Sequence, residues 1–274
     1  MKRLNHALTF AALLLGTCLW AQEAPASAEV PAPKPLRELF TTGAGVTDPG
    51  VVVLDAGAQV SYDRDSSRAR RFPTQIDFGI CQWIDVRASW GGPTTLRDVQ
   101  GSSQSGGADP LIGGQFQGLR QEKAGVDLGL AYWHKLPRAS VEKGIGTGKA
   151  DDTLVVAASR TDGPWEFDVN AGANWLGRTD ADGRIRQGVL SLAVTRVFSG
   201  GWNVSLDNYA LAATELGPRT VTSILGVSRD LTSNLTVDVA LEAGLTHSGE
   251  RLAIDAGLAW RMGRLWGQNQ TGGW

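Results

Sequence analysis

The stretch Leu235–Thr246, which reads LTVDVALEAGLT, alternates between apolar and polar side chains along its whole length. Val239 and Leu241 fall on one face of the alternation, and Asp238 and Glu242 fall on the other. Successive residues of a β-strand point to opposite faces, whereas a helix repeats every 3.6 residues. The stretch therefore predicts a strand with one apolar face and one polar face.

The same alternation recurs along most of the 274-residue chain. Most of the segments approach the length of about 9–11 residues that a tilted strand needs to cross a membrane. The 35 glycines also favour turns and strands, because glycine costs about 1 kcal/mol in a helix. About twelve strands are predicted, at 51–62, 74–81, 84–91, 109–118, 124–133, 152–160, 165–176, 187–198, 202–211, 219–228, 235–246 and 252–262.

Connection lengths and aromatic residues favour a membrane barrel. The connections after even-numbered strands are short and those after odd-numbered strands are mostly long, as in outer-membrane barrels with periplasmic turns and outside loops. Aromatic rings with one polar atom prefer the boundary between lipid and water. A single up-and-down antiparallel transmembrane β-barrel is therefore expected, with an aromatic girdle at each rim. The girdle candidates are Tyr62, Trp83, Trp90, Trp165, Trp175, Trp202, Trp260 and Trp266.

The chain divides into four expected parts. Residues 1–21 are typical of a secretory signal peptide, with Lys2 and Arg3 before an apolar middle. Residues 22–46, rich in Ala, Glu and Pro, are expected to be a flexible periplasmic lead-in. The barrel is expected over 47–266, followed by a C-terminal extension over 267–274. The expected location is the outer membrane of a Gram-negative cell, with outer-membrane lipid and, during insertion, the barrel-assembly machinery as partners.

The polar face predicts what lies inside the barrel. A charge on the lipid side costs about 2–4 kcal/mol at the midplane, so the polar face should point inward. Acidic residues dominate this face, which predicts a weak preference for cations. A turn at Gln82 should place Asp77 opposite Arg87, and a turn near Ser248–Gly249 should place Asp238 near Arg261. The candidates for lining the interior are Asp55, Gln59, Asp77, Asp85, Arg87, Asp127, Glu166, Asp168, Asn170, Asn174, Asp207, Asp238, Glu242, Asp255 and Arg261.

Two structural alternatives remain open in the sequence. A soluble sandwich or small barrel would show the same alternation with its apolar face turned inward. Within the membrane reading, twelve strands lie between the filled eight-strand barrel and the water-filled sixteen-strand barrel. The interior is then either a narrow conduit for small solutes or a plug of salt-bridged side chains.

Several short motifs, in order along the chain, resemble the phenol meta-pathway (MetA-type) outer-membrane transporter-like family. The resemblance covers about Thr41 to Met262 and implies a barrel that passes small molecules, aromatic ones among them. At one motif the chain departs from the family, with Ala108-Asp109-Pro110 where Gly-Asp-Leu is usual. The motifs are TDPG (47–50), LDAG (54–57), IDFGI (76–80), IDVR (84–87), GADPLIGG (107–114), LP (136–137), GIGTGKAD (144–151) and DLTSNLTVD (230–238).

Signals for other chemistry are weak. The 26 basic and 28 acidic residues do not indicate a nucleic-acid-binding surface. His134 and His247 could pair with Ser140, Ser248 or Asp151 in a barrel hydrolase, but the Gly-x-Ser-x-Gly nucleophile motif is missing. The sequence therefore predicts no enzyme, no metal and no cofactor. The expected function is passive movement of a small-molecule solute, the second hypothesis is a structural or adhesive surface barrel, and the third is the hydrolase.

Overall fold

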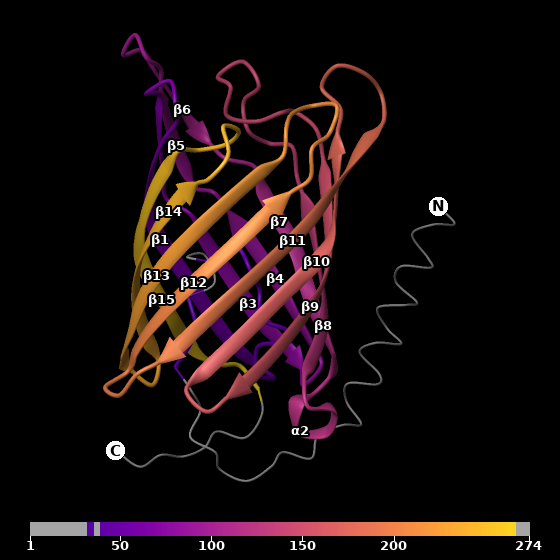
Figure 1. The fold of residues 1–274 in the computed structure, drawn as a ribbon, viewed down its shortest axis with the longest axis vertical. Helices are drawn as coiled ribbons and strands as arrows, with labels where there is room; N and C mark the ends of the chain where they lie inside the picture. Colours follow the sequence, from indigo (N-terminus) through magenta and orange to yellow (C-terminus); the bar gives the residue numbers. More distant parts are fainter. Residues whose placement is uncertain (1–31, 36–38, 267–274) are drawn as a thin grey trace.

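The computed structural model describes residues 32–35 and 39–266, and shows a closed antiparallel β-barrel (Figure 1). The closure is made by β15 pairing with β1. This confirms the predicted fold class, and each predicted strand overlaps one barrel strand. The twelve barrel strands are β1 (Val51–Tyr62), β3 (Thr74–Cys81), β4 (Ile84–Trp90), β7 (Pro110–Leu119), β8 (Asp127–Lys135), β9 (Asp151–Asp162), β10 (Trp165–Gly177), β11 (Arg184–Val197), β12 (Trp202–Leu211), β13 (Thr220–Thr232), β14 (Leu235–Gly244) and β15 (Leu252–Arg264).

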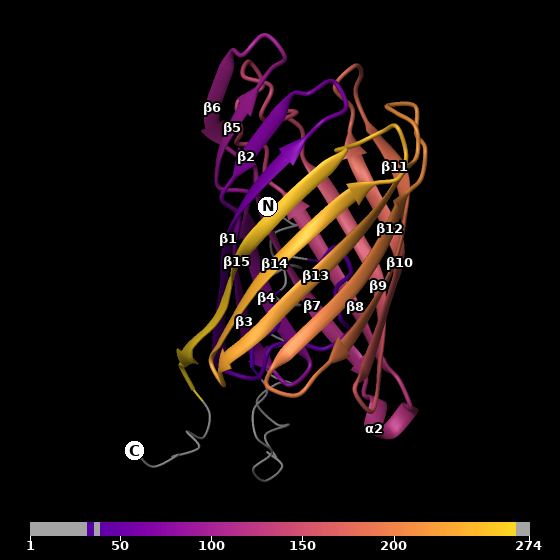
Figure 2. The ribbon, with the colours of Figure 1, turned by 60° about the vertical axis from the view of Figure 1, so that its left-hand side comes forward.

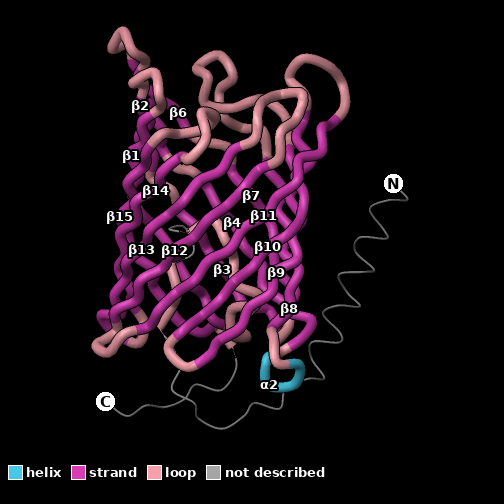
Figure 3. The backbone as a smooth tube through the Cα atoms, in the orientation of Figure 1, coloured by secondary structure: helices cyan, strands magenta, loops and turns pink. Residues whose placement is uncertain are grey.

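The two rims of the barrel differ in their connections (Figure 3). At the lower rim, where β1 begins and β15 ends, the connections are short, as at 82–83, 163–164 and 233–234. Gly163 lies in one of these turns with φ 56°, a left-handed conformation that favours glycine. The single helical turn α2 (Gln121–Ala124) lies at the same rim. The upper rim carries long loops, as the sequence predicted.

Three short strands were not predicted. They are β2 (Arg68–Arg71), β5 (Pro93–Arg97) and β6 (Ser103–Gly107), and they extend the sheet from β1 above the upper rim (Figure 2). Beyond the barrel wall neither face of a strand has to be apolar. The short, arginine-rich β2 and the Ser- and Gly-rich β6 therefore carry no alternation to detect.

The barrel turns its apolar face outward. Val239 and Ile254 are 54% and 46% exposed, whereas Asp238 and Asp255 on the opposite face are 4% and 6% exposed. A soluble barrel would show the reverse arrangement, so that alternative is wrong. Within residues 32–35 and 39–266, no helix is long and apolar enough to cross a membrane.

The cross-strand register confirms one predicted pair and corrects another. Asp77 lies opposite Arg87 in the β3–β4 hairpin, as expected. Asp238 lies opposite Gly257, and Arg261 lies opposite Val53 of β1, so the prediction that Asp238 is near Arg261 is wrong. The β14–β15 loop is centred one residue earlier than predicted, on His247–Ser248, and each such shift moves a cross-strand partner by two residues.

Candidate functional site: the barrel interior

All fifteen predicted interior residues lie on the inward face of their strands. Their strand positions alternate with the exposed apolar residues of the outer surface. Whether a solute passes along them stays a prediction. Nine are buried, namely Asp55, Asp77, Asp85, Arg87, Asp168, Asn170, Asp207, Asp238 and Asp255. Six are half-buried, namely Gln59, Asp127, Glu166, Asn174, Glu242 and Arg261.

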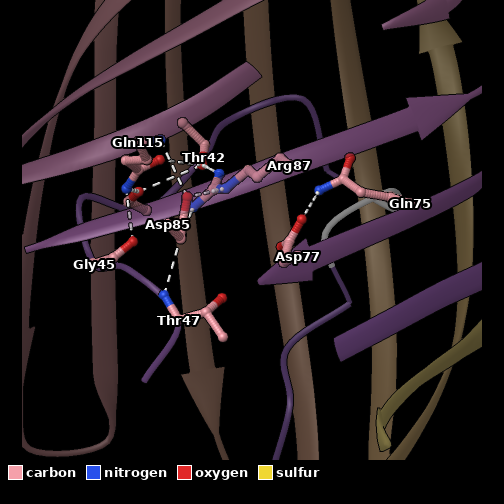
Figure 4. Close-up of polar contacts among 9 residues, drawn as sticks. Thr42, Gly45, Thr47, Gln75, Asp77, Asp85, Arg87 and Gln115 are labelled. Atoms are coloured by element: carbon pink, nitrogen blue, oxygen red, sulfur yellow. Dashed lines mark hydrogen bonds and ion pairs between the residues drawn. The ribbon is translucent and has the colours of Figure 1, made fainter. Parts of the chain in front are cut away.

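A buried ion pair on β4 is the centre of the interior network (Figure 4). Arg87 donates from Nε to Asp85 Oδ1 at 2.9 Å and from Nη2 to Asp85 Oδ2 at 2.8 Å. The two residues are two apart on one strand, so both side chains point inward. Asp77, opposite Arg87 on β3, accepts a hydrogen bond from Gln75 Nε2 at 2.9 Å. The bidentate geometry fixes a charged pair in the wall of the interior.

The chain from Phe40 to Gly50, here called the inner segment, lies against the inward face of the barrel before it enters β1. The Thr41 backbone N–H donates to Asp207 Oδ2 of β12 at 2.7 Å, and its hydroxyl donates to Oδ1 at 2.6 Å. The Thr42 N–H donates to Asn170 Oδ1 of β10, and Asn170 Nδ2 donates back to the Thr42 carbonyl, both at 2.8 Å. The beginning of the inner segment is therefore held by two strands of the wall.

The inner segment continues across further strands (Figure 4). The Ala44 N–H donates to Ser159 Oγ of β9 at 2.7 Å. Gln115 Nε2 of β7 donates to the carbonyls of Gly43 and Gly45 at 2.7 and 2.6 Å. The Thr47 N–H donates to Asp85 Oδ2 at 3.1 Å. The segment thus passes along the interior from β12 to β4 and uses the predicted interior carboxylates as its acceptors.

Glycines in the wall allow this close approach. A Cβ added at Gly129 of β8 would lie 2.7 Å from the Ala44 carbonyl oxygen, and one at Gly79 of β3 would overlap the backbone of Thr47 and Asp48. Residues 41–46 belong to the stretch expected as a lead-in, and the structure places them inside the barrel. The signal peptide over 1–21, residues 22–31 of the lead-in and the extension over 267–274 lie outside the described residues.

A second polar network lies toward the upper rim. Arg71 of β2 donates from Nη1 to Gln59 Oε1 at 2.9 Å and to Glu250 Oε1 at 2.8 Å. Ser61 also donates to Glu250 Oε1, at 2.8 Å, and Gln59 Nε2 donates to Asp255 Oδ2 at 3.1 Å. The strand extension above the rim therefore contributes a cation, Arg71, to the interior.

One region of the interior is apolar. Ala131, Val155 and Val189 are buried together, and Leu211 packs against them. Near the middle of the interior, the Phe40 ring stacks on Tyr209 with centroids 4.0 Å apart. The interior therefore offers an apolar wall on β8, β9, β11 and β12 beside its acidic groups.

The prediction named mainly charged residues, together with Gln59, Asn170 and Asn174, and missed most of the neutral polar residues of the interior. The alternation of apolar and polar residues could have identified Gln115 as an interior residue, since it lies within a predicted strand. No local signal marks Thr41 or Thr42, because their partners lie 166 and 128 residues away, respectively. The buried neutral polar residues that were missed are Thr41, Ser61, Gln115, Gln117, Ser159, Ser191, Ser205, Thr222, Ser228 and Thr236.

The girdle candidates fall at the two rims. Tyr62, Trp90 and Trp175 lie at the upper ends of their strands, and the lower rim carries Trp83, Trp165, Trp202, Trp260 and Trp266. At the lower rim Arg196 lies over the Trp165 ring and Arg229 over the Trp202 ring, each at 5.0 Å. Arginine above an aromatic ring stabilises both in a polar boundary layer. Contact of these rings with lipid headgroups stays a prediction.

Two of the long upper loops are tied together by Arg178. Its Nη2 donates to Asp180 Oδ2 and its Nη1 to Glu215 Oε2, both at 2.8 Å. The hydrogen bonds from Arg178 hold the pKa of the Asp180 carboxyl below its usual value. The loops after β10 and β12 are thereby joined by an exposed charge pair.

His134 pairs with a different carboxylate from the one considered in the sequence. Its Nδ1 lies 2.7 Å from Asp152 Oδ1, and Asp152 also binds Tyr132 and Arg184. Asp151 forms an ion pair with Lys135. Among the described residues, no cluster of three or more His, Cys, Asp or Glu side chains is placed to hold a metal ion.

Comparisons with known proteins agree with the barrel geometry. A family model described as "Putative MetA-pathway of phenol degradation" matches residues 39–262. No curated protein matches the sequence. An outer-membrane channel from Pseudomonas putida F1 is similar in structure, with 13% identity and a TM-score of 0.61, covering 81% of this chain and 99% of that chain. The NanC porin has 8% identity and a TM-score of 0.55, covering 77% of this chain and 100% of that chain.

Proposed function

The chain belongs to this phenol-degradation family, and from that premise and the barrel geometry we propose that it is an outer-membrane channel for passive movement of small molecules. The observation that carries the proposal is the combination of a closed barrel, an exposed apolar outer face and an acidic interior. An apolar band around a closed barrel is compatible with lipid tails, because closure leaves no free strand edge in the wall.

The inner segment is the restriction in this channel. Its backbone N–H groups donate hydrogen bonds to Asp207, Asn170, Ser159 and Asp85, and its carbonyls accept hydrogen bonds from Asn170 and Gln115. Two of the acceptors are carboxylates, whose hydrogen bonds contribute about 1.5–3 kcal/mol each, against about 0.5–1.5 kcal/mol for a neutral acceptor. The segment is therefore held in the path and narrows it, and its displacement would widen the path.

The lining favours small neutral or cationic solutes, aromatic ones among them. The acidic groups attract cations, and the buried cluster of Ala131, Val155, Val189 and Leu211 makes part of the interior wall apolar. The family description, which names phenol degradation, also supports aromatic molecules as solutes. The movement follows the concentration gradient and needs no covalent step, so we infer that the protein is not an enzyme.

Conductance in planar bilayers tests the proposal. The purified barrel should produce discrete conductance steps, and proteoliposomes should swell in small sugars and small aromatic alcohols. A correctly folded barrel that conducts nothing and causes no swelling would support the structural or adhesive alternative. Heat-modifiable gel mobility serves as the folding control.

Deletion of residues 39–46 should raise the unitary conductance several-fold, because the segment no longer occupies the interior. Gly129→Ala is the matched point variant, since its methyl group meets the Ala44 carbonyl and should displace the same segment. Gly217→Ala, in the loop after β12, is its control, because nothing lies within 4 Å of the added Cβ and the backbone there is not left-handed. Unchanged conductance in both the deletion variant and Gly129→Ala would contradict the proposal that the inner segment restricts the channel.

We also propose that the barrel-assembly machinery inserts the protein. An outward apolar surface of this extent cannot remain in water during transit. Depletion of that machinery should lower the amount of heat-modifiable barrel in the outer-membrane fraction.

A further inference from the structure

Three arginines form a recess on the strand extension above the upper rim. Arg68 and Arg70 of β2 and Arg97 of β5, with Thr95 and Ser103, line a recess of about 100 Å³. Arg68 lies directly opposite Arg97 in the β2–β5 pairing. Like charges placed directly opposite one another on neighbouring strands destabilise a sheet. The arrangement is therefore unfavourable unless an anion is added to it.

No carboxylate of the described chain compensates these three charges. Other arginines near the upper rim have a partner, as Arg71 has Glu250 at 2.8 Å and Arg178 has Asp180 at 2.8 Å. Within residues 32–35 and 39–266, Arg68, Arg70 and Arg97 form no ion pair. Their donors are thus free to bind an external group.

The recess faces the outer surface of the barrel and not the interior. Arg68 lies opposite Tyr62 of β1, and Arg70 lies opposite Val60, whereas the neighbouring Arg71 points inward to Gln59. Paired residues of an antiparallel sheet share a face. The recess therefore continues the outer wall directly above Tyr62.

Exposed aromatic residues lie below the recess. Phe72, which follows β2, is 54% exposed, and Trp90 at the end of β4 is 39% exposed. Aromatic rings of this kind mark the headgroup level of a membrane. Positive groups just beyond that level meet the phosphates of the lipid headgroups.

We propose that the recess formed by Arg68, Arg70 and Arg97 binds the phosphate of a phosphorylated glycolipid in the outer leaflet. Guanidinium groups donate two parallel hydrogen bonds to phosphate oxygens, and the Ser103 hydroxyl adds a further donor. The acyl chains of such a lipid would lie against the apolar wall below Tyr62. The inference rests on the membrane orientation of the proposed function, since it places the upper rim outside the cell.

Native mass spectrometry of the detergent-solubilised barrel tests the inference with three probes. The probes are lipid A carrying two phosphates, the same lipid without phosphates, and inorganic phosphate. Bisphosphorylated lipid A should bind, the dephosphorylated lipid should bind at least tenfold more weakly, and inorganic phosphate at equal concentration should neither bind nor compete.

The variant Arg68→Gln/Arg70→Gln/Arg97→Gln should lose at least tenfold in affinity for bisphosphorylated lipid A. The matched control is Arg160→Gln/Arg196→Gln/Arg229→Gln, which removes the same charge from the outward face of the lower rim. That control should change the affinity less than twofold. Both variants should keep the conductance of the parent, because none of these side chains lies in the interior.

Three results would overturn the inference. They are equal affinity for the two forms of the lipid, effective competition by inorganic phosphate, and an equal loss in the lower-rim control. A barrel that binds the lipid as expected but conducts nothing would overturn the proposed channel and leave this site standing.

Discussion

At the residue scale, the Asp85–Arg87 pair is the contact on which the interior depends most. The Asp85 side chain is 0% exposed and the Arg87 side chain is 6% exposed. Replacing Asp85 by Asn removes the carboxylate that holds the buried guanidinium in bidentate contact and leaves Asp77, opposite it on β3, as the remaining negative group. Breaking a buried pair of this kind costs about 3–5 kcal/mol in comparable proteins. Asp85→Asn should therefore lower the free energy of unfolding by that order, measured by urea denaturation in lipid vesicles.

The double variant Asp85→Asn/Arg87→Gln is the control at this scale. It removes both charges and keeps the approximate shape and hydrogen-bonding capacity of the pair. It should recover part of the lost stability, because Asp77 then keeps only the hydrogen bond from Gln75. If the double variant is as unstable as Asp85→Asn, the loss comes from broken packing or from the contact with Thr47, and not from the unpaired charge.

At the scale of the element, each barrel strand is defined by which of its faces meets lipid. Leu190 lies midway along β11 and is 57% exposed on the outer surface. Leu190→Arg should reduce the free energy of unfolding in vesicles by about 2–4 kcal/mol, because an arginine at the midplane is far from water. Phe198→Arg, one residue beyond the lower end of the same strand and 43% exposed on the outer surface, should cost only about 0–1 kcal/mol.

The contrast between the two positions separates lipid exposure from loss of packing. In detergent micelles, where water reaches the surface more readily, the difference between Leu190→Arg and Phe198→Arg should shrink. Equal costs at both positions in vesicles would contradict the placement of β11 across the bilayer.

At the scale of the whole molecule, the interior charges set the ion preference. Ten of the fifteen predicted interior residues are Asp or Glu and two are Arg, and all fifteen point inward. Under a KCl gradient the reversal potential should therefore have the sign of a weakly cation-selective channel. The preference should fall as salt concentration rises, because the screening length is about 10 Å at 0.1 M and about 3 Å at 1 M.

A double neutralisation checks the origin of this selectivity. Asp238→Asn/Asp255→Asn should shift the reversal potential toward zero while conductance steps persist. Anion selectivity of the parent barrel would mean that the acidic residues identified here do not control the path of the ions.

The sequence by itself determined the barrel strands and the direction in which each face points. Alternation is a local property of the sequence, and the cost of placing a charge in lipid acts on every strand independently. The residues next to Asp238 and Leu241 are therefore enough to predict that Asp238 points inward and Leu241 points outward. The Asp77–Arg87 pair was predictable for the same reason, since a two-residue turn fixes its register.

Only the tertiary structure decided the position of the inner segment, the register of the β14–β15 hairpin and the arginine recess. Thr41 meets Asp207 across 166 residues, and no local pattern encodes that distance. The β14–β15 loop has seven residues, so the sequence is compatible with several cross-strand registers. The pairing of β15 with both β14 and β1 determines which register forms. Arg68 and Arg97 come together because β2 and β5 pair outside the membrane, where hydrophobic alternation no longer constrains the sequence.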